Sequence, residues 1–363
     1  MTLGVPPLDH LRVLSDDVGV IQHAIENVPN RSTGYCTDDV ARALIVVLQR
    51  LTIAPGDADA MSLASRYLSF LHDAQRSDGR FHNFMNYQRA WIDDVGTHDS
   101  CGRAIWSLGF AVRHAPDPAW QRIAASMLDR ALAAADWLEY PRAQSYAMLG
   151  IAHAVHAGGS PALALTLDQL AQALLDRYRA ERDDGWEWFE PFMTYDNARI
   201  CEALLRAGVE LGDRAMREAG LRTLGFLESV VFEGSVFVPI GNAGWFERGG
   251  PRARFAQQPL EAASMADAEL AAFAATGGVA HLASAQRAAG WYRGNNLLGV
   301  SMAASGGGCY DGLEEGGPSR NVGAESTLAY LSTAYTMAAM RRLGKTTLGG
   351  ESTLDDNSGV RST

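Results

Sequence analysis

Two kinds of helical segment alternate along this chain, and the alternation restricts the fold more than any other feature of the sequence. Apolar residues recur at three- and four-residue spacings through most of the 363 residues, which is the pattern of amphipathic helices. Six segments are small and apolar on all sides, whereas the segments between them, such as 162–182, carry a polar face. A helix that is apolar all round is buried and one with a polar face lies at the surface. The alternation therefore predicts two concentric rings of helices.

Six helical hairpins closed into a ring form an all-α (α/α)6 barrel, which is the predicted fold. The pattern predicts helices over 38–52, 60–75, 99–115, 117–138, 142–157, 162–182, 195–212, 213–231, 258–276, 279–294 and 323–342, with a short additional one at 16–27. The segments before several inner helices are rich in β-type and aromatic residues with Gly turns, so short β-hairpins are expected at one mouth. We expect a single domain over 1–343 and a flexible, Gly/Ser/Thr/Asp-rich tail over 344–363.

Composition excludes several classes of function. The net charge of −11 argues against nucleic acid as a partner, because phosphate contacts need clustered cations. Lys345 is the only lysine, so enzymes that need a buried lysine for a Schiff base are excluded. No apolar run reaches the roughly 18 residues of a membrane span, and no short-range ligand motif for a metal or cofactor is present. With four widely spaced cysteines and no signal-peptide pattern, we expect a cytoplasmic protein that needs no cofactor and no membrane.

Acidic residues mark the first turn of five of the six inner helices. They are Asp38, Asp39, Asp99, Asp196, Glu261 and Glu325. The third inner helix instead begins with Arg142, Gln144 and Tyr146. An acid at this position also suits the positive end of the helix dipole, so capping is the alternative interpretation for each acid alone. In a ring of helices, however, these ends converge on one mouth, which predicts a carboxylate cluster there.

Aromatic and amide side chains accompany these acids, and together they indicate a carbohydrate site. Sugar rings stack their C–H faces on aromatic rings, and their hydroxyls bind carboxylates and amides. The predicted substrate-binding residues are Asp38, Asp39, Asp196, Glu325, Tyr35, Trp91, Trp188, Tyr195, Asn242, Trp245, Gln258, Asp311 and Asn321. The expected partner is an oligosaccharide or glycoside.

Glu261 and Asp99 are the predicted catalytic pair, as acid and base of an inverting glycoside hydrolase. Inner helices two and five face each other in a six-membered ring, which sets these two acids across the mouth. Asp39 and Asp196 each have an Arg three residues on, which should hold them ionised, whereas Glu261 has no cation at i+3 or i+4. Carboxyl groups about 6.5–9.5 Å apart leave room for a water molecule and imply inversion of the anomeric centre.

Several motifs resemble a bacterial family that is often labelled glycosyltransferase. They include Gly34-Tyr35-Cys36-Thr37-Asp38-Asp39, Asp99-Ser100-Cys101-Gly102-Arg103, Thr194-Tyr195-Asp196-Asn197-Ala198-Arg199, Gln257-Gln258-Pro259-Leu260-Glu261 and Gly323-Ala324-Glu325-Ser326. The family's region follows true glycosyltransferase domains in longer fusions, so the resemblance implies a functional association with a glycosyltransferase. Its wider fold similarity is to six-hairpin glycosidases. The chain departs from the family's pattern at Val40, Cys101 and Val322, where Asn, His and Gln are expected.

Three other functions stay open at this point. A glycoside phosphorylase needs a phosphate site, for which Arg248, Arg252 and Arg254 are available. A sugar epimerase of the same architecture needs acid–base residues, for which His82 and His98 are candidates. A non-catalytic glycan-binding module that serves a glycosyltransferase needs only the sugar-binding side chains.

Overall fold

The computed structural model describes residues 4–349, which are mainly helical. The α-helices are α1 (Asp9–Leu14), α2 (Thr37–Ile53), α3 (Ala58–Ala74), α4 (His98–His114), α5 (Pro118–Ala131), α6 (Pro141–His156), α7 (Pro161–Glu181), α8 (Ala198–Glu210), α9 (Arg214–Val231), α10 (Pro259–Thr276), α11 (Val279–Gly290) and α12 (Ala324–Gly349). None of the helices in this part of the chain has the length and apolar character needed to cross a membrane.

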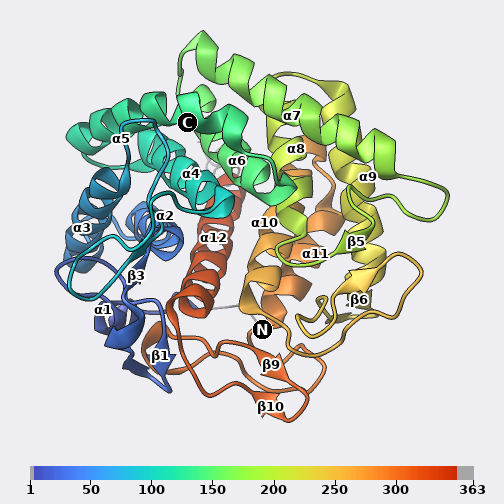
Figure 1. Cartoon of the computed structure of the whole chain (residues 1–363). Helices are drawn as coiled ribbons and strands as arrows, with labels where there is room; N and C mark the ends of the chain where they lie inside the picture. The colour runs from blue at the N-terminus through green and yellow to red at the C-terminus, as the bar shows by residue number, and fades with distance from the viewer. Residues whose placement is uncertain (1–3, 350–363) are drawn as a thin grey trace, which may run out of the picture.

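The even-numbered helices form a closed inner ring. Each packs against the next in the order α2, α4, α6, α8, α10 and α12, and α12 returns to α2. The helices α3, α5, α7, α9 and α11 cover this ring from outside, and the short α1 packs on α12 (Figure 1). The predicted (α/α)6 barrel is therefore confirmed, and its buried residues form one main core that runs through both rings.

Glycines let α4 and α6 approach each other closely. A Cβ atom built on Gly109 would lie 1.9 Å from the backbone oxygen of Gly150, and one on Gly150 would lie 2.2 Å from that of Ile105. Neither position accepts a side chain unless the two helices move apart. The close approach of α4 and α6 is thus a direct consequence of glycines in the sequence.

Replacement of Gly109 by Ala should therefore destabilise the barrel by at least about 1–3 kcal/mol, the usual cost of overpacking a core. Gly225 of α9 provides the matched control, because a Cβ there meets no atom within 4 Å. Gly225→Ala should stabilise the protein by about 0.5–1 kcal/mol through helix propensity. Urea denaturation of both variants measures the two effects, and a stable Gly109→Ala protein would contradict the close approach.

All strands lie in segments that lead into inner helices, so they gather at the end of the barrel where those helices begin, here called the N-terminal mouth. They are β1 (Ala24–Ile25), β2 (Val28–Pro29), β3 (Tyr35–Cys36), β4 (Phe84–Met85), β5 (Phe192–Met193), β6 (Phe232–Glu233), β7 (Val236–Phe237), β8 (Phe246–Glu247), β9 (Leu313–Glu314) and β10 (Gly317–Pro318). The pairs β1–β2, β6–β7 and β9–β10 are antiparallel hairpins, as expected. The pairs β3–β4 and β5–β8 instead join two different loops and so connect neighbouring hairpins of the barrel.

Helix positions differ from the sequence prediction in several places. The helix predicted over 117–138 ends at Ala131 and is followed by a 3-10 helix over Leu132–Trp137, and the one predicted over 279–294 ends at Gly290. The short helix predicted over 16–27 is wrong, because the Asp16 carboxylate accepts hydrogen bonds from the backbone of Val18 and Gly19 and forms a turn. The helix predicted from residue 195 begins at Ala198, since Asp196 has a positive φ of 49°. Helix α12 continues to Gly349, so residues 344–349 of the expected tail are helical, whereas 350–363 lie outside the described residues.

Candidate active site

The six acids predicted from the helix starts belong to one polar network at the N-terminal mouth. Arg42 of α2 forms ion pairs with Asp38 at 2.9 Å, with Asp39 at 2.9 Å and with Glu325 at 2.7 Å. One guanidinium thus joins the first turns of α2 and α12. Asp39 is buried, whereas the Asp38 and Glu325 side chains are 19% and 41% exposed, so the cluster has a buried part and a part open to solvent.

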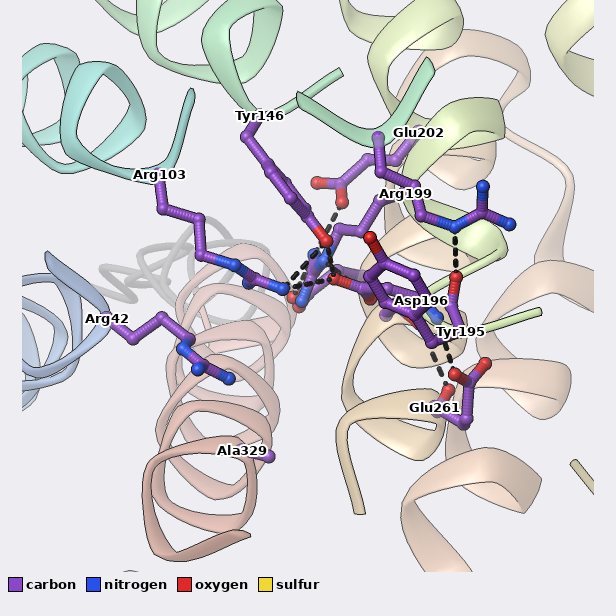
Figure 2. Close-up of polar contacts among 12 residues, drawn as sticks. Arg42, Arg103, Tyr146, Tyr195, Asp196, Arg199, Glu202, Glu261 and Ala329 are labelled. Atoms are coloured by element: carbon purple, nitrogen blue, oxygen red, sulfur yellow. Dashed lines mark hydrogen bonds and ion pairs between the residues drawn. The ribbon is translucent and has the colours of Figure 1, made fainter. Parts of the chain in front are cut away.

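Arg103 of α4 extends this network to the far side of the ring. Its guanidinium contacts Asp38 at 3.0 Å and Asp196 at 3.1 Å, and it donates to the Tyr146 hydroxyl at 2.7 Å. The same hydroxyl donates to Asp196 at 2.7 Å. Figure 2 shows Arg103 and Tyr146 pointing toward Asp196 from α4 and α6. Side chains from α4 and α6 therefore converge on the Asp196 carboxylate just before α8.

Asp196 is held as a carboxylate at the centre of the network. Its side chain is 2% exposed, and Arg199 approaches its second oxygen at 3.5 Å. Burial acts to raise the pKa of Asp196, but Arg199 and Arg103 outweigh it and keep the pKa below its ordinary value. The left-handed backbone at Asp196 turns the chain before α8 begins, and thereby brings the side chain beneath the mouth rather than onto the first helical turn.

Glu261 lies beside Asp196, but its pKa is shifted in the opposite direction. One of its carboxyl oxygens accepts a hydrogen bond from the backbone N–H of Asp196. The residue is 6% exposed, and burial, reinforced by the negative charge of Asp196, raises the pKa of Glu261 to about 8. The rise agrees with the sequence, in which Glu261 has no cation at i+3 or i+4. Glu261 therefore carries a proton at neutral pH, next to an acid that does not.

Two consecutive residues, Tyr195 and Asp196, link Asp99 to Glu261 through hydrogen bonds. The Tyr195 hydroxyl donates to Asp99 at 2.6 Å, while the neighbouring Asp196 N–H donates to Glu261. The Trp245 ring lies beside that of Tyr195, tilted by 49°, with ring centroids 6.3 Å apart. Burial raises the pKa of Asp99, and Arg103 and the Tyr195 hydrogen bond oppose that rise. The mouth therefore combines two carboxyl groups, a tyrosine and a half-buried tryptophan.

The pKa of Asp39 differs from the expectation drawn from the sequence, in which Arg42 holds this acid ionised. Burial raises the pKa of Asp39 to about 7, and the nearby carboxylates of Asp38 and Glu325 oppose the effect of Arg42. One guanidinium shared among three acids does not compensate for the loss of water around the most buried of them.

Three predicted aromatic contacts lie away from this network. Trp188 is fully buried, so its prediction as a sugar platform is wrong. Tyr35 is also buried, and its hydroxyl donates to Asp16. Trp91 stacks on His82 and donates to Asp73 of the outer helix α3. In each case a loop aromatic packs against its own hairpin, which the sequence does not distinguish from an aromatic that faces the mouth.

Four predicted polar residues have structural roles or lie at the rim. The Asp311 carboxylate accepts from Gly323 N–H and the Ser326 hydroxyl, and so holds the start of α12. Asn321 is exposed and accepts from the Glu26 backbone. Asn242 is exposed in the loop before Trp245, and Gln258 is half-buried at the N-cap of α10 without a side-chain cap bond. The predictions that Asn242 and Gln258 bind substrate remain predictions.

The network contains residues that the predicted site lacks. Arg103 and Tyr146 orient Asp196, and Arg142 donates to the Tyr195 carbonyl, to Asn197 at 3.0 Å and to Glu190 at 2.7 Å. The start of the third inner helix carried a signal for two of them, because it has Arg142 and Tyr146, one helical turn apart, where the others have acids.

The arginines that a phosphorylase would need for its phosphate site are paired with acids. Arg248 pairs with Glu181 and Asp183, while Arg252 and Arg254 both pair with Glu233, so these arginines do not form a free phosphate site.

The two candidate histidines also lie outside the network. His82 bonds the Asp93 carbonyl and His98 stacks on Trp137. Within residues 4–349, no three His, Cys, Asp or Glu side chains come together as a metal site.

A second buried glutamate of α10, Glu269, predicts how stability depends on pH. It is fully buried, and burial together with Glu228 raises its pKa to about 9. The folded state therefore keeps a proton that the unfolded state loses above its ordinary pKa of about 4.3. This contribution to stability falls as pH rises from about 4.3 to about 9. Glu269→Gln should flatten the dependence of Tm on pH over that range, and an unchanged pH dependence would contradict the raised pKa.

Comparison of the sequence with models of protein families and with curated proteins finds no match. Solved structures with the same fold include a sugar epimerase from a ruminal bacterium, with a TM-score of 0.71 and 13% identity over 91% of this chain and 94% of that one. The cellobiose 2-epimerase from Bacillus thermoamylovorans B4167 has a TM-score of 0.71 and 12% identity over 93% and 96% of the two chains. The GH76 alpha-mannanase from Bacteroides thetaiotaomicron has a TM-score of 0.64 and 10% identity over 93% and 95%. The likeness shows a shared (α/α)6-barrel fold.

Proposed function

We propose that this chain is a carbohydrate-active enzyme that hydrolyses a glycosidic bond at the N-terminal mouth. Glu261 serves as the proton donor to the leaving oxygen, and Asp99 serves as the base that activates water. The observation that carries the proposal is the protonated carboxyl group of Glu261 in one network with the Asp99 carboxyl, the two being linked through the consecutive residues Tyr195 and Asp196. Glycoside hydrolysis needs a carboxylic acid and a carboxylate in the same site at the same pH.

Each group in the network has a role in this mechanism. Trp245 and Tyr195 offer aromatic faces on which a sugar ring stacks, next to the Asp99 carboxyl. Asp38 and Glu325 are partly exposed and accept hydrogen bonds from sugar hydroxyls. Arg103, Tyr146 and Arg199 engage both carboxylate oxygens of Asp196, so it does not act on substrate directly, and its negative charge keeps the proton on Glu261.

The rate should fall on the alkaline side with an apparent pKa of about 8. The reason is that Glu261 must keep its proton to act as the acid, and its pKa is raised to about 8. The dependence of kcat/KM on pH reports groups of the free enzyme, so this profile is the one to measure. A rate that stays constant up to pH 10 would contradict Glu261 as the proton donor.

The function itself is tested by release of reducing sugar from a panel of oligosaccharides, with and without inorganic phosphate. Release without phosphate supports hydrolysis. Proton NMR of the first product formed tests the expected inversion, which requires the anomer opposite to that of the substrate. Binding of the panel without any turnover would instead favour the non-catalytic glycan-binding module.

A sugar epimerase is the second candidate, because two of the similar solved structures are described as sugar epimerases. An epimerase removes a proton from carbon and returns it to the other face, so its product formed in D2O carries deuterium at that carbon. Incorporation of deuterium without a gain in reducing ends would select the epimerase. The association with a glycosyltransferase, which the family resemblance implies, remains a prediction that co-purification tests.

A further inference from the structure

The turn at residues 194–197, which lies just before α8, contacts both members of the proposed catalytic pair. The Tyr195 hydroxyl donates to Asp99 of α4 at 2.6 Å, and the Asp196 N–H donates to Glu261 of α10. Figure 2 shows Tyr195, Asp196 and Glu261 next to one another. A change in the conformation of this single turn would therefore disturb the general acid and the base together.

The turn has a backbone conformation that needs support from its surroundings. Asp196 has a φ of 49°, and a residue other than glycine keeps such a left-handed conformation only where neighbouring groups fix it. Arg103 and Tyr146 fix the carboxylate of Asp196. They do not bond to Tyr195 or Asn197 on either side of it, so these two neighbours need a second support.

Arg142, in the first turn of α6, supplies this second support. Its buried guanidinium donates to the backbone oxygen of Tyr195, to the side-chain oxygen of Asn197 at 3.0 Å and to the Glu190 carboxylate at 2.7 Å. The guanidinium carbon also lies 4.9 Å from the centre of the Tyr195 ring. All three nitrogens are thus bonded, in the fixed directions that the planar fork of an arginine provides.

The side chain of Asn197 connects Arg142 to the other end of the turn. Its oxygen, which accepts from Arg142, also accepts from the Thr194 N–H at 3.1 Å, and its NH2 group donates to the Thr194 carbonyl at 2.8 Å. Among the hydrogen bonds and ion pairs of residues 4–349, none joins Arg142 to Asp99 or to Glu261. The hydrogen bonds of Arg142 therefore reach this pair only through the turn.

We propose that Arg142 is the positioning residue of the N-terminal mouth, which holds the turn at 194–197 so that Asp99 and Glu261 keep their places in the reaction. The inference rests on the proposed function, because it assigns Arg142 to the reaction of that pair. It gives the start of α6, the one inner helix without an acid in its first turn, a part in the site.

Titration of the Tyr195 hydroxyl tests this role without any turnover. Burial and the Asp99 carboxyl raise the pKa of Tyr195 above its ordinary value, and the cations Arg142 and Arg103 oppose that rise. Arg142→Lys keeps the charge and loses the planar fork, whereas Asn197→Ala keeps Arg142 and loses its link to the turn. In both variants Tyr195 should move away from Asp99, so its pKa should fall toward the ordinary value of about 10. NMR of tyrosine labelled with ¹³C measures the pKa, with Tyr195→Phe to assign the signal.

Asn296 provides the matched control for Asn197. It is also buried, and its NH2 group closes a turn after α11 by donating to the carbonyls of Trp291 at 2.9 Å and Val300 at 2.8 Å. Asn296→Ala should therefore disturb the fold in a comparable way but leave the pKa of Tyr195 unchanged. A wild-type pKa of Tyr195 in both Arg142→Lys and Asn197→Ala would overturn the inference.

Kinetics of the same variants test the link to the reaction. With the oligosaccharide that the panel identifies, Arg142→Lys and Asn197→Ala should each lower kcat by about 10²-fold, which a misplacement of about 1 Å can cause, while Asn296→Ala should not. A wild-type kcat in both variants would show that Arg142 does not position the catalytic pair. If the pKa of Tyr195 falls in both variants but no oligosaccharide is hydrolysed, Arg142 does hold the turn and the proposed function is what fails.

Discussion

Replacing Glu261 with Gln should lower kcat by about 10²–10⁴-fold, the usual contribution of a positioned general acid. Gln cannot give a proton to the leaving oxygen. It is nevertheless neutral, as Glu261 is at neutral pH, and its carbonyl oxygen can still accept the hydrogen bond from Asp196 N–H. The variant should therefore fold normally. The measurement is kcat on the oligosaccharide that the panel identifies, together with Tm.

Glu269→Gln is the matched control for this experiment. Glu269 lies on the same helix, is also buried and has a pKa raised to about 9, but it bonds His281 at 2.7 Å, away from the mouth. The kcat of the Glu269→Gln variant should equal that of the wild type. If Glu261→Gln retains a wild-type rate while Asp39→Asn is inactive, the acid has been placed on the wrong inner helix, since burial also raises the pKa of Asp39, to about 7.

The largest effect on stability is expected for Arg103→Met. Arg103 is buried and pairs with both Asp38 and Asp196 across the mouth, so its loss removes a cation that these two acids share. Removal of one member of a buried ion pair costs about 3–5 kcal/mol. Asp38 and Asp196 keep Arg42 and Arg199 as neighbours, but both of these cations already pair with other acids and compensate only in part. Urea denaturation at neutral pH measures the change in unfolding free energy.

Two comparisons separate this effect from simple loss of side-chain volume. Arg103→Met combined with Asp196→Asn should recover part of the stability, because Asn needs no counter-charge. Arg214→Met removes an exposed pair with Glu218 and should change the unfolding free energy little, since solvent screens such pairs. Equal stability of Arg103→Met and the wild type would show that the network contributes nothing to the fold.

Much of the fold was predictable because the signal is local. Helix periodicity and the contrast between apolar and polar-faced segments are properties of consecutive residues, and they predicted the two rings. The helix predicted at 16–27 failed for an equally local reason, as the Asp16 side chain competes for backbone N–H groups. The start of α8 failed for a different reason, because the left-handed backbone at Asp196 is stabilised by partners from other helices.

The gathering of the six acids also followed from the sequence, since the starts of all inner helices in such a ring meet at one mouth. Their individual states did not follow. Asp39 and Asp196 share the same spacing to an Arg, yet the pKa of Asp39 is raised to about 7 and that of Asp196 is lowered. The difference comes from the neighbours of each acid: Arg103 and Tyr146 bond directly to Asp196, whereas the carboxylates of Asp38 and Glu325 raise the pKa of Asp39.

By itself the sequence determined the class of fold and the set of acids at the mouth, because both depend on residues near one another in the chain. Only the tertiary structure decided which acid keeps its proton and which aromatic ring faces the mouth. Trp188 and Trp245 both follow a glycine within three residues, but one is fully buried and the other is half-buried beside Tyr195. Burial and charge depend on side chains brought together from distant segments, and no spacing along the chain records that arrangement.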